Sequence, residues 1–438
     1  MRVALTVRDF IDRAELVYGD RIGLVDDPGG SEPGGDEHAP GSSWGAITYR
    51  ELGRRVRAFA AGLDALGLAT GDRVAIVSPN AARFVAALYG TCVSGRIFVP
   101  INFRLHAHEV EYIVGHSGAR VLLVDPELDA TLADVRAEHR FVLGPASDER
   151  LFLHDRAPVL GELDEDQTAT LNYTSGTTAR PKGVQLTHRN LWINATTFGW
   201  HAGVCDRDRF LHVVPLFHCN GWGMPFALAG MGATQVVLRK VSGAAILQRV
   251  KEHGITATNG APAVVNGVLD AAKAWEGPIP GAGITRIVVA GAPPPTRTIE
   301  RVETELHWEF IQIYGLTETS PLLTFNRRRE EHDALDPAQR AIRLGRAGAP
   351  VIGARVRTDE HGEVLARANV VTEGYWQDPQ ATAAAIVDGW FHTGDGGTID
   401  EEGYVSISDR KKDVIITGGE NVSSIEVEDC LSSHPDVA

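Results

Sequence analysis

The sequence predicts an α/β protein with more than one structural unit. Between residues 48 and 350, apolar stretches of strand length alternate with stretches whose apolar residues recur at helical spacing. This alternation is typical of parallel sheets covered by helices. After Pro350 the pattern changes to short strands and turns, which indicates a small β-rich unit. A chain of 438 residues is long enough to bury a large core in such units.

The elements follow in order from the N-terminus. Residues 1–20 have the pattern of an amphipathic helix, and residues 26–45, rich in Gly, Pro, Ser and acidic residues, are expected as a surface loop. A helix over 48–66 ends at Gly67, before a strand at 73–77. The remaining predicted elements are helices at 81–95 and 425–431 and strands at 97–101, 121–124, 169–173, 210–214, 235–238, 286–290, 308–313, 353–358 and 403–407.

Composition excludes several classes of protein. A hydrophobic content of 43% with 23% charged residues is ordinary for a soluble globular protein. The net charge of −15 argues against a nucleic-acid surface, which requires a basic patch. No segment reaches the ~20 apolar residues of a membrane span, and we see no signal peptide. The four cysteines are scattered without CxxC spacing, so we expect no disulfide or zinc site, and a reducing, cytoplasmic location.

The most informative segment is a run rich in hydroxyls and glycines at residues 173–184. Glycines let a backbone approach a bulky anion, and hydroxyls and amides donate hydrogen bonds to it. Lys182 adds a mobile positive charge that suits phosphate. A solvated turn is the alternative explanation of such a cluster. A Walker A loop is excluded, because Lys182 follows a proline and no Ser or Thr comes after it.

This run resembles the phosphate-binding signature of the adenylate-forming enzymes, which include acyl-CoA synthetases, luciferases and the adenylation domains of peptide synthetases. Ala179 replaces the glycine usual there, and it would be strained if the backbone required a positive φ. The resemblance implies ATP, Mg²⁺ and, as co-substrate, coenzyme A, with Lys182 catalytic and Thr178 at the metal. The nucleotide-binding residues that it implies in this run are Thr174, Ser175, Gly176, Thr177 and Thr178.

A second segment, residues 314–320, follows the strand predicted at 308–313. An aromatic ring can pack on a base and a carboxylate can hold Mg²⁺, although Thr317 could simply be a helix N-cap. The segment matches the YGxTE signature of the family. That match implies Tyr314 and Gly315 at the adenine, Thr317 at the α-phosphate and Glu318 as the metal ligand, the last two being catalytic. The preceding turn implies adenine and acyl contacts from Ala290, Gly291, Ala292 and Pro293.

Two further segments complete the resemblance. Residues 390–395 match the family's WFxTGD motif, which implies that Asp395 binds the ribose hydroxyls, although an acidic turn residue is often only a cap. Residues 408–422 resemble the hinge segment of the family, although charge runs are usually solvated faces. The residues implied there are Arg410 at ribose or phosphate, Lys412 as the hinge pivot, and Gly418 and Gly419 beside the pantetheine arm of CoA.

The segment from Pro215 to Trp222 separates the branches of the family. Amino-acid-activating domains usually carry an aspartate directly after the phenylalanine, where this chain has His218. A buried substrate ammonium would therefore remain unpaired, at a cost of several kcal/mol. The segment instead resembles that of medium- and long-chain acyl-CoA synthetases, which implies substrate contacts from His218, Asn220 and Trp222 and a catalytic role for His218. The alternatives are a structural histidine and a core tryptophan.

The resemblance also implies a domain organisation. Residues 1–410 correspond to a large AMP-binding N-terminal domain with two α/β subdomains, parallel-rich sheets and a small distorted β-barrel. Residues 411–438 correspond to the hinge and the start of a mobile C-terminal domain that is mostly missing. In the family that domain carries a lysine for adenylation, and no lysine follows Lys412 here. We therefore expect a truncated chain with impaired turnover.

The expected activity is that of an AMP-forming acid–thiol ligase. It would form an acyl-adenylate from ATP and a carboxylic acid, a fatty acid in the first instance, and then an acyl-CoA thioester. The alternatives are a nucleotide- and acyl-binding protein without full turnover, or another acyl-adenylate-forming ligase. We expect small-molecule partners only, with no nucleic acid and no integral membrane segment, and a homodimer stays open.

Overall fold

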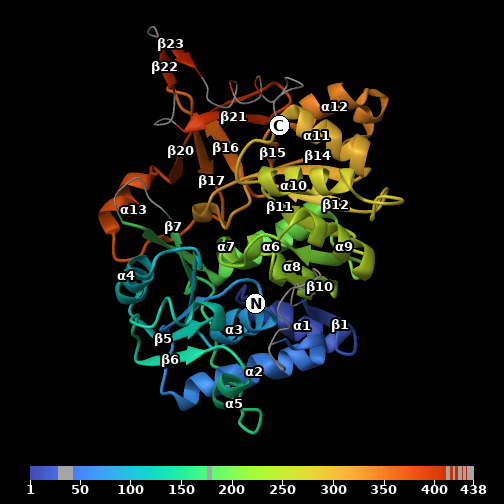
Figure 1. Cartoon of the computed structure of the whole chain (residues 1–438). Helices are drawn as coiled ribbons and strands as arrows, with labels where there is room; N and C mark the ends of the chain where they lie inside the picture. Colours follow the sequence, from blue (N-terminus) through green and yellow to red (C-terminus); the bar gives the residue numbers. More distant parts are fainter. Residues whose placement is uncertain are drawn as a thin grey trace. The chain divides into compact units, whose positions relative to one another are not determined.

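The computed structural model describes residues 1–27, 43–174 and 180–410, together with the backbone of 415–417 and 420–422 and residues 427 and 431; side chains 409 and 410 are not described. The chain forms two compact units. Unit 1 comprises Met1–Lys240 and Thr372–Pro379, and unit 2 comprises Val241–Val371 and Gln380–Ala438. The helices and strands of both units are labelled in Figure 1. The predicted boundary between residues 410 and 411 stays a prediction.

Unit 1 contains a seven-stranded sheet whose centre is parallel and whose one side is antiparallel. Strands β4, β3, β5, β6 and β7 pair in parallel, while β8 and β18 pair antiparallel at the edge next to β7. The strands are β3 (Arg73–Val77), β4 (Ile97–Ile101), β5 (Ala119–Val124), β6 (His139–Val142), β7 (Thr168–Thr174), β8 (Lys182–Thr187) and β18 (Gly374–Tyr375). The helices nearby in sequence are α2 (Tyr49–Ala65), α3 (Ala82–Val93), α4 (Ala107–Ser117), η1 (Pro126–Leu128) and α5 (Pro145–Leu151).

Strand β3 shows why this sheet is covered on both faces. Val74 and Ile76 belong to the apolar cluster that contains residues of α2 and α3, whereas Ala75 and Val77 belong to the cluster that contains residues of α4. Successive side chains of a strand point to opposite faces, so both faces of β3 are buried. The predicted strands at 73–77 and 97–101 are confirmed with the bounds that the sequence indicated.

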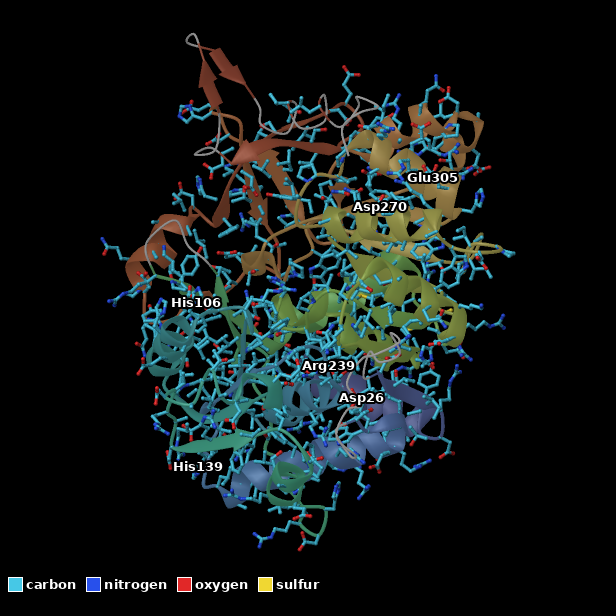
Figure 2. The ribbon with its side chains drawn as sticks, in the orientation of Figure 1. Asp26, His106, His139, Arg239, Asp270 and Glu305 are labelled. Atoms are coloured by element: carbon cyan, nitrogen blue, oxygen red, sulfur yellow. The ribbon has the colours of Figure 1, made fainter. Side chains whose placement is uncertain are left out.

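The other strands of unit 1 pair in the order β9, β10, β1, β2. They are β1 (Ile22–Asp27), β2 (Gly45–Thr48), β9 (Arg209–His212) and β10 (Thr234–Leu238), accompanied by α1 (Arg8–Tyr18), α6 (His188–Ala202), α7 (Cys219–Trp222) and α8 (Met224–Met231). The expectation that a loop begins at residue 26 was wrong, because β1 continues to Asp27. The Asp26 carboxylate, labelled in Figure 2, accepts hydrogen bonds from the backbone N–H groups of Trp44 and Ala82, at 2.9 Å each. It therefore ties the β1–β2 pair to the first residue of α3.

Unit 2 contains a sheet in the order β11, β12, β13, β14, β15. The first three strands are parallel and the last two antiparallel. The strands are β11 (Ala257–Gly260), β12 (Arg286–Val289), β13 (Glu309–Tyr314), β14 (Thr324–Arg327) and β15 (Ala349–Pro350). The helices are α9 (Gly243–His253), α10 (Pro262–Lys273), α11 (Thr296–Arg301), η2 (Val302–Leu306), η3 (Thr317–Thr319), η4 (Glu330–Ala334) and α12 (Pro337–Leu344). The carboxyl ends of β11, β12 and β13 meet at one edge.

The part of unit 2 after Pro350 is a small antiparallel sheet, as the short strands and turns of the sequence indicated. Its strands are β16 (Arg355–Thr358), β17 (Glu363–Arg367), β19 (Ile386–Val387), β20 (Trp390–Ile399) and β21 (Val405–Arg410); β22 (Ile415–Thr417) pairs with β23 (Glu420–Val422), and α13 spans Pro379–Ala385. The long strand β20 pairs with β17, β19 and β21. The predicted α/β class with parallel-rich sheets is therefore confirmed.

Two expectations about the whole chain were examined in its described part. None of the described helices combines the length and the apolar character that a membrane crossing requires. Among the described side chains, Cys92, Cys205 and Cys219 form no disulfide bond. Cys430 lies outside the described side chains.

Candidate active site

Unit 2 brings together the two side chains expected at the base and the ribose of a nucleotide. Tyr314 is the last residue of β13, and Asp395 lies in β20, 81 positions later. The Tyr314 hydroxyl donates a hydrogen bond to Asp395 Oδ2 at 2.8 Å. Asp395 is only 6% exposed, and its backbone N–H donates to Thr393 Oγ1, which in turn donates to the Val364 carbonyl. The tyrosine and the carboxylate are therefore held in one hydrogen-bonded group.

Gly315 allows the chain to turn sharply directly after Tyr314. A Cβ atom at this position would overlap the carbonyl oxygen of Pro321, so a larger residue would push the following turn away. The turn is held by the Thr319 side chain, whose Oγ1 accepts the Leu316 N–H at 2.9 Å and donates to the Pro321 carbonyl at 2.7 Å. Steric crowding thus explains why the YGxTE segment has glycine at this position.

Thr317 and Glu318 lie in η3, directly after this turn, and both are half-buried. They stand at the edge of the sheet where β13 ends. The N-cap interpretation of Thr317 does not fit, because η3 begins at Thr317 itself and its N-cap residue is Leu316.

The turn after β12 lies at the same edge as Tyr314, since β12 and β13 are parallel with Val289 opposite Gln312. The N–H of Ala290 donates to the Gly260 carbonyl at 3.3 Å. Gly291 then adopts a φ of +96°, which favours glycine, and Gly291 and Ala292 are exposed while Pro293 is half-buried. Exposed residues at the carboxyl ends of parallel strands are well placed to contact a ligand.

Mg²⁺ usually keeps several waters and is bound through one or two carboxylates together with substrate phosphates. Among the described residues there is no group of three or more His, Cys, Asp or Glu side chains that would hold a metal ion alone. Glu318, a single half-buried carboxylate, fits the Mg²⁺ mode in which the nucleotide supplies the other oxygens. Thr178, the second expected metal residue, lies outside the described residues.

In unit 1, the two ends of the predicted phosphate run belong to an antiparallel strand pair. Thr174, at the end of β7, lies opposite Lys182, at the start of β8. The Lys182 ammonium lies 5.0 Å from the centre of the Tyr375 ring, a cation–π distance. Tyr375 belongs to β18, which pairs with β8. Ser175, Gly176, Thr177, Thr178 and Ala179 lie outside the described residues.

Helix α4 contacts both ends of the same run, which the sequence did not indicate. The Tyr173 hydroxyl and His116 Nδ1 are 2.8 Å apart, and the Arg180 guanidinium lies 5.5 Å from the Tyr112 ring centre. Tyr112 and His116 are four residues apart on the helix and stack at 5.3 Å. Such i, i+4 pairs are common in any helix, so the sequence held no signal that this pair would contact the run.

The predicted acyl-binding residues of unit 1 differ in their exposure. His218 is exposed, while Asn220 and Trp222 are buried. The protein atoms around its ring and then the Arg104 guanidinium lower the pKa of His218, so the imidazole is neutral at neutral pH. The neighbouring Phe217 packs edge-on against Phe103 at 5.5 Å. The Asn220 amide instead turns inward and donates to Thr170 Oγ1 at 3.0 Å.

The remaining predicted residues are only partly described. The backbone register of β20 and β21 places Arg410 opposite Asp395, although the Arg410 side chain is not described. Lys412, Gly418 and Gly419 lie outside the described residues. Their roles stay predictions.

Comparison with known proteins identifies the family. Residues 25–376 match the family model of the AMP-binding enzyme. The chain belongs to this family. The 2-methylpropanoate–CoA ligase of Humulus lupulus is 33% identical over 99% of this chain and 81% of its own length. The feruloyl-CoA synthase of Amycolatopsis sp is 35% identical over 90% of this chain and 79% of its own length.

Solved structures agree with this AMP-binding assignment. An o-succinylbenzoate CoA synthetase from Bacillus subtilis, in complex with its acyl-adenylate intermediate, is 28% identical, with a TM-score of 0.81 over 98% of this chain and 83% of its own. The expected adenylate-forming family is therefore confirmed, and with it the expectation of an AMP-forming acyl-CoA synthetase.

Proposed function

We propose that this AMP-binding enzyme activates a carboxylic acid with an uncharged apolar tail, a fatty acid in the first instance, and transfers the acyl group to CoA. In the first step a carboxylate oxygen attacks the α-phosphorus of ATP, the bond to pyrophosphate breaks, and an acyl-adenylate forms. In the second step the CoA sulfur attacks the acyl carbon, the thiol proton is lost, and AMP leaves. Both steps depend mainly on positioning and on neutralising charge.

The hydrogen bond between Tyr314 and Asp395 carries the nucleotide part of this proposal. It places an aromatic ring beside a buried carboxylate, at the end of a parallel strand. In our assignment Tyr314 lies against adenine and Asp395 accepts hydrogen bonds from the ribose hydroxyls. The half-buried Thr317 and Glu318 in the following turn contact phosphate and the metal ion, whose chemistry when bound is to neutralise phosphate charge.

The acyl part of the proposal rests on unit 1. His218 is neutral, and the segment around it contains no carboxylate to pair with a substrate ammonium. Desolvating an unpaired ammonium is costly, so an uncharged tail is favoured over an amino acid. Lys182 is assigned to phosphate. Its ammonium lies over the face of the Tyr375 ring, and this contact does not neutralise its charge as a carboxylate would. The two relatives named above act, by their names, on a branched short acid and on an aromatic acid.

A panel of carboxylic acids tests this proposal. The chain is incubated with ATP, Mg²⁺ and CoA and with straight-chain acids of several lengths, 2-methylpropanoate, ferulate and amino acids, and the release of AMP and pyrophosphate is measured. We expect acid-dependent release with the uncharged acids and none with amino acids. A response confined to amino acids would contradict the acyl assignment. ATP binding without turnover of any acid would instead show a binding protein.

A further inference from the structure

The segment between His218 and Met224 contains an unusual backbone turn. All five residues from Cys219 to Gly223 have positive φ angles, of 32°, 48°, 61°, 64° and 74° in chain order. L-residues disfavour this left-handed conformation because Cβ approaches the backbone, and normally it occurs at single glycine or asparagine positions. Here Cys219 and Trp222 adopt it as well. This left-handed turn, residues 219–223, needs a source of stabilisation.

Side-chain hydrogen bonds between the turn and two other elements supply it. Asn220 Nδ2 donates to Thr170 Oγ1 on β7 at 3.0 Å, and Asn194 Nδ2 on α6 donates to the Trp222 carbonyl at 3.2 Å. Both asparagines and Thr170 have no exposed surface. Inside the turn, the Gly221 N–H donates to the His218 carbonyl at 2.8 Å. The turn is therefore fastened to β7 and to α6.

Neither glycine position of the turn has room for a side chain. A Cβ atom at Gly221 would come within 2.8 Å of Leu216, and one at Gly223 would overlap the Asn194 amide. The close approach of Gly223 is what lets the Asn194 amide reach the Trp222 carbonyl. Glycine is thus required twice here, for conformation and for space.

The cluster is not arranged for stability alone. Asn172 Nδ2 donates to the same Thr170 Oγ1 at 2.9 Å, so two amides share one acceptor. In the described part of the chain, Asn172 Oδ1 and Asn220 Oδ1 are buried without any hydrogen-bond partner. Unpaired buried oxygens and left-handed non-glycine residues both cost free energy, and such features concentrate at functional sites.

The anchor of the turn lies on the strand that leads into the phosphate run. Thr170 and Asn172 are four and two residues before Thr174, the end of β7. We propose that Thr170, Asn194 and Asn220 are positioning residues that hold the left-handed turn, and so fix His218 and Trp222 relative to the strand that carries the phosphate-binding run. This inference rests on the proposed acyl role of His218 and Trp222. It adds the residues that set the position of those acyl contacts.

Two substitutions at one position separate the conformation from the amide. Asn220→Gly removes the amide but suits a positive φ, whereas Asn220→Ala removes the amide and strains the turn. We expect Asn220→Gly to melt several degrees above Asn220→Ala. At Asp270, an exposed position in the right-handed helix α10, the order of the Gly and Ala variants should be the reverse. A higher melting temperature for Asn220→Ala than for Asn220→Gly would overturn the left-handed turn, whatever the substrate is.

Kinetics test the positioning role. For the best acid of the panel, we expect Asn220→Ala and Asn194→Ala to lower kcat/KM for the acid about 10-fold or more, with the KM for ATP changed less than about 2-fold. Asn220→Gly, which loses the hydrogen bond to Thr170 but suits the positive φ, should lose less than Asn220→Ala. Thr285→Val, which removes one buried hydrogen bond to the Ile255 carbonyl in unit 2, controls for a general loss of stability and should leave both KM values unchanged.

The outcomes are distinguishable. Wild-type values of kcat/KM for both Asn220→Ala and Asn194→Ala would overturn the positioning role while leaving the proposed function intact. If the wild type turns over no acid, the proposed function and the positioning role are both wrong, and the melting order alone decides whether the turn is left-handed.

Discussion

The Tyr314 hydroxyl donates to the Asp395 carboxylate across 2.8 Å, joining the end of β13 to the middle of β20. We expect Tyr314→Phe to keep the ring at the base but to release Asp395 from this contact. A hydrogen bond to a charged group stabilises that group by about 1.5–3 kcal/mol. The ribose hydroxyls would recover part of this loss when they bind Asp395. The KM for ATP should therefore rise about 2- to 10-fold with kcat little changed. Steady-state kinetics at saturating acid measure this, and an unchanged KM would show that the Tyr314 hydroxyl does not position Asp395 for the nucleotide.

Gly315→Ala should damage the nucleotide side of unit 2. The added Cβ would overlap the Pro321 carbonyl oxygen and displace η3 with Thr317 and Glu318. We expect a loss of about 1–3 kcal/mol in the free energy of unfolding and a raised KM for ATP. The matched control is Gly115→Ala in α4, where nothing lies within 4 Å of the new Cβ and alanine should stabilise by about 0.5–1 kcal/mol. Equal effects of the two substitutions on urea unfolding would contradict the steric account.

A buried ion pair stabilises unit 1. Asp125, directly after β5, receives two hydrogen bonds from Arg239, directly after β10, at 2.6 and 2.9 Å, and the two side chains are 3% and 15% exposed. Removing one partner of a buried pair costs about 3–5 kcal/mol when the other charge is left unpaired. Arg239 also lies 3.1 Å from the Glu127 carboxylate, so Asp125→Ala should cost less, about 1–3 kcal/mol. The control is Asp270→Ala, which breaks the exposed pair with Lys273 and should cost under about 0.5 kcal/mol. Figure 2 labels Arg239 and Asp270. Similar unfolding midpoints for the two variants would refute the buried pair.

Stability should fall as the pH falls from about 6.5 to 4. Burial, and to a lesser extent Arg8, lowers the pKa of His188 to about 4. Burial also lowers the pKa of His212 to about 4, although the hydrogen bond that its ring donates to Gln235 Oε1 acts in the opposite direction. Between these values and the ordinary pKa of 6.5, the unfolded chain binds protons that the folded chain does not. The two neutral rings therefore make their full contribution to the free energy of unfolding above pH 6.5. Acidification lowers the free energy of unfolding by up to roughly 3 kcal/mol per ring.

Urea unfolding at several pH values measures this dependence. His188→Leu should flatten the profile between pH 6.5 and 4 by removing one of the two rings. Both ring nitrogens of His188 are buried and have no hydrogen-bond partner among the described residues, which indicates a neutral ring. If this variant kept the full slope of the wild type, that assignment would be wrong.

Glu318→Ala tests the assigned metal ligand. If Glu318 holds the ion at the phosphates, acid-dependent exchange of pyrophosphate into ATP should fall about 10-fold or more, and raising the Mg²⁺ concentration should recover part of it. Glu305→Ala, at an exposed carboxylate paired with Arg301, is the control and should exchange normally. Normal exchange in Glu318→Ala would show that the metal role is wrong.

The sequence predicted the parts of this molecule that are encoded locally. The strands at 73–77 and 97–101 stand out because their apolar residues are contiguous and bounded by turn signals. The nucleotide residues were assigned because their motifs are short and resemble a known family, and these assignments stay predictions. Contacts between distant residues left no such signal: nothing near Lys182 indicates Tyr375, and nothing near Asp26 indicates Ala82.

Backbone conformation was the second feature that the sequence did not predict. The composition of residues 219–223 includes two glycines and an asparagine, which tolerate positive φ, but Cys219 and Trp222 do not favour it. Their conformation is imposed by Asn194 and Thr170, which are far away in the sequence. The sequence did not predict the continuation of β1 to Asp27 for a similar reason. Two consecutive acidic residues are typical of a loop, and the burial of Asp26 depends on its partners Trp44 and Ala82.

Asp395, beside Tyr314, is proposed to bind the nucleotide of an adenylate-forming reaction. Isothermal titration of ATP into the wild type and into Asp395→Ala tests it most directly, with circular dichroism confirming that both are folded. Loss of the carboxylate should weaken ATP binding about 10- to 100-fold, since each charged hydrogen bond to ribose contributes about 1.5–3 kcal/mol. A dissociation constant for Asp395→Ala equal to that of the wild type would contradict the account.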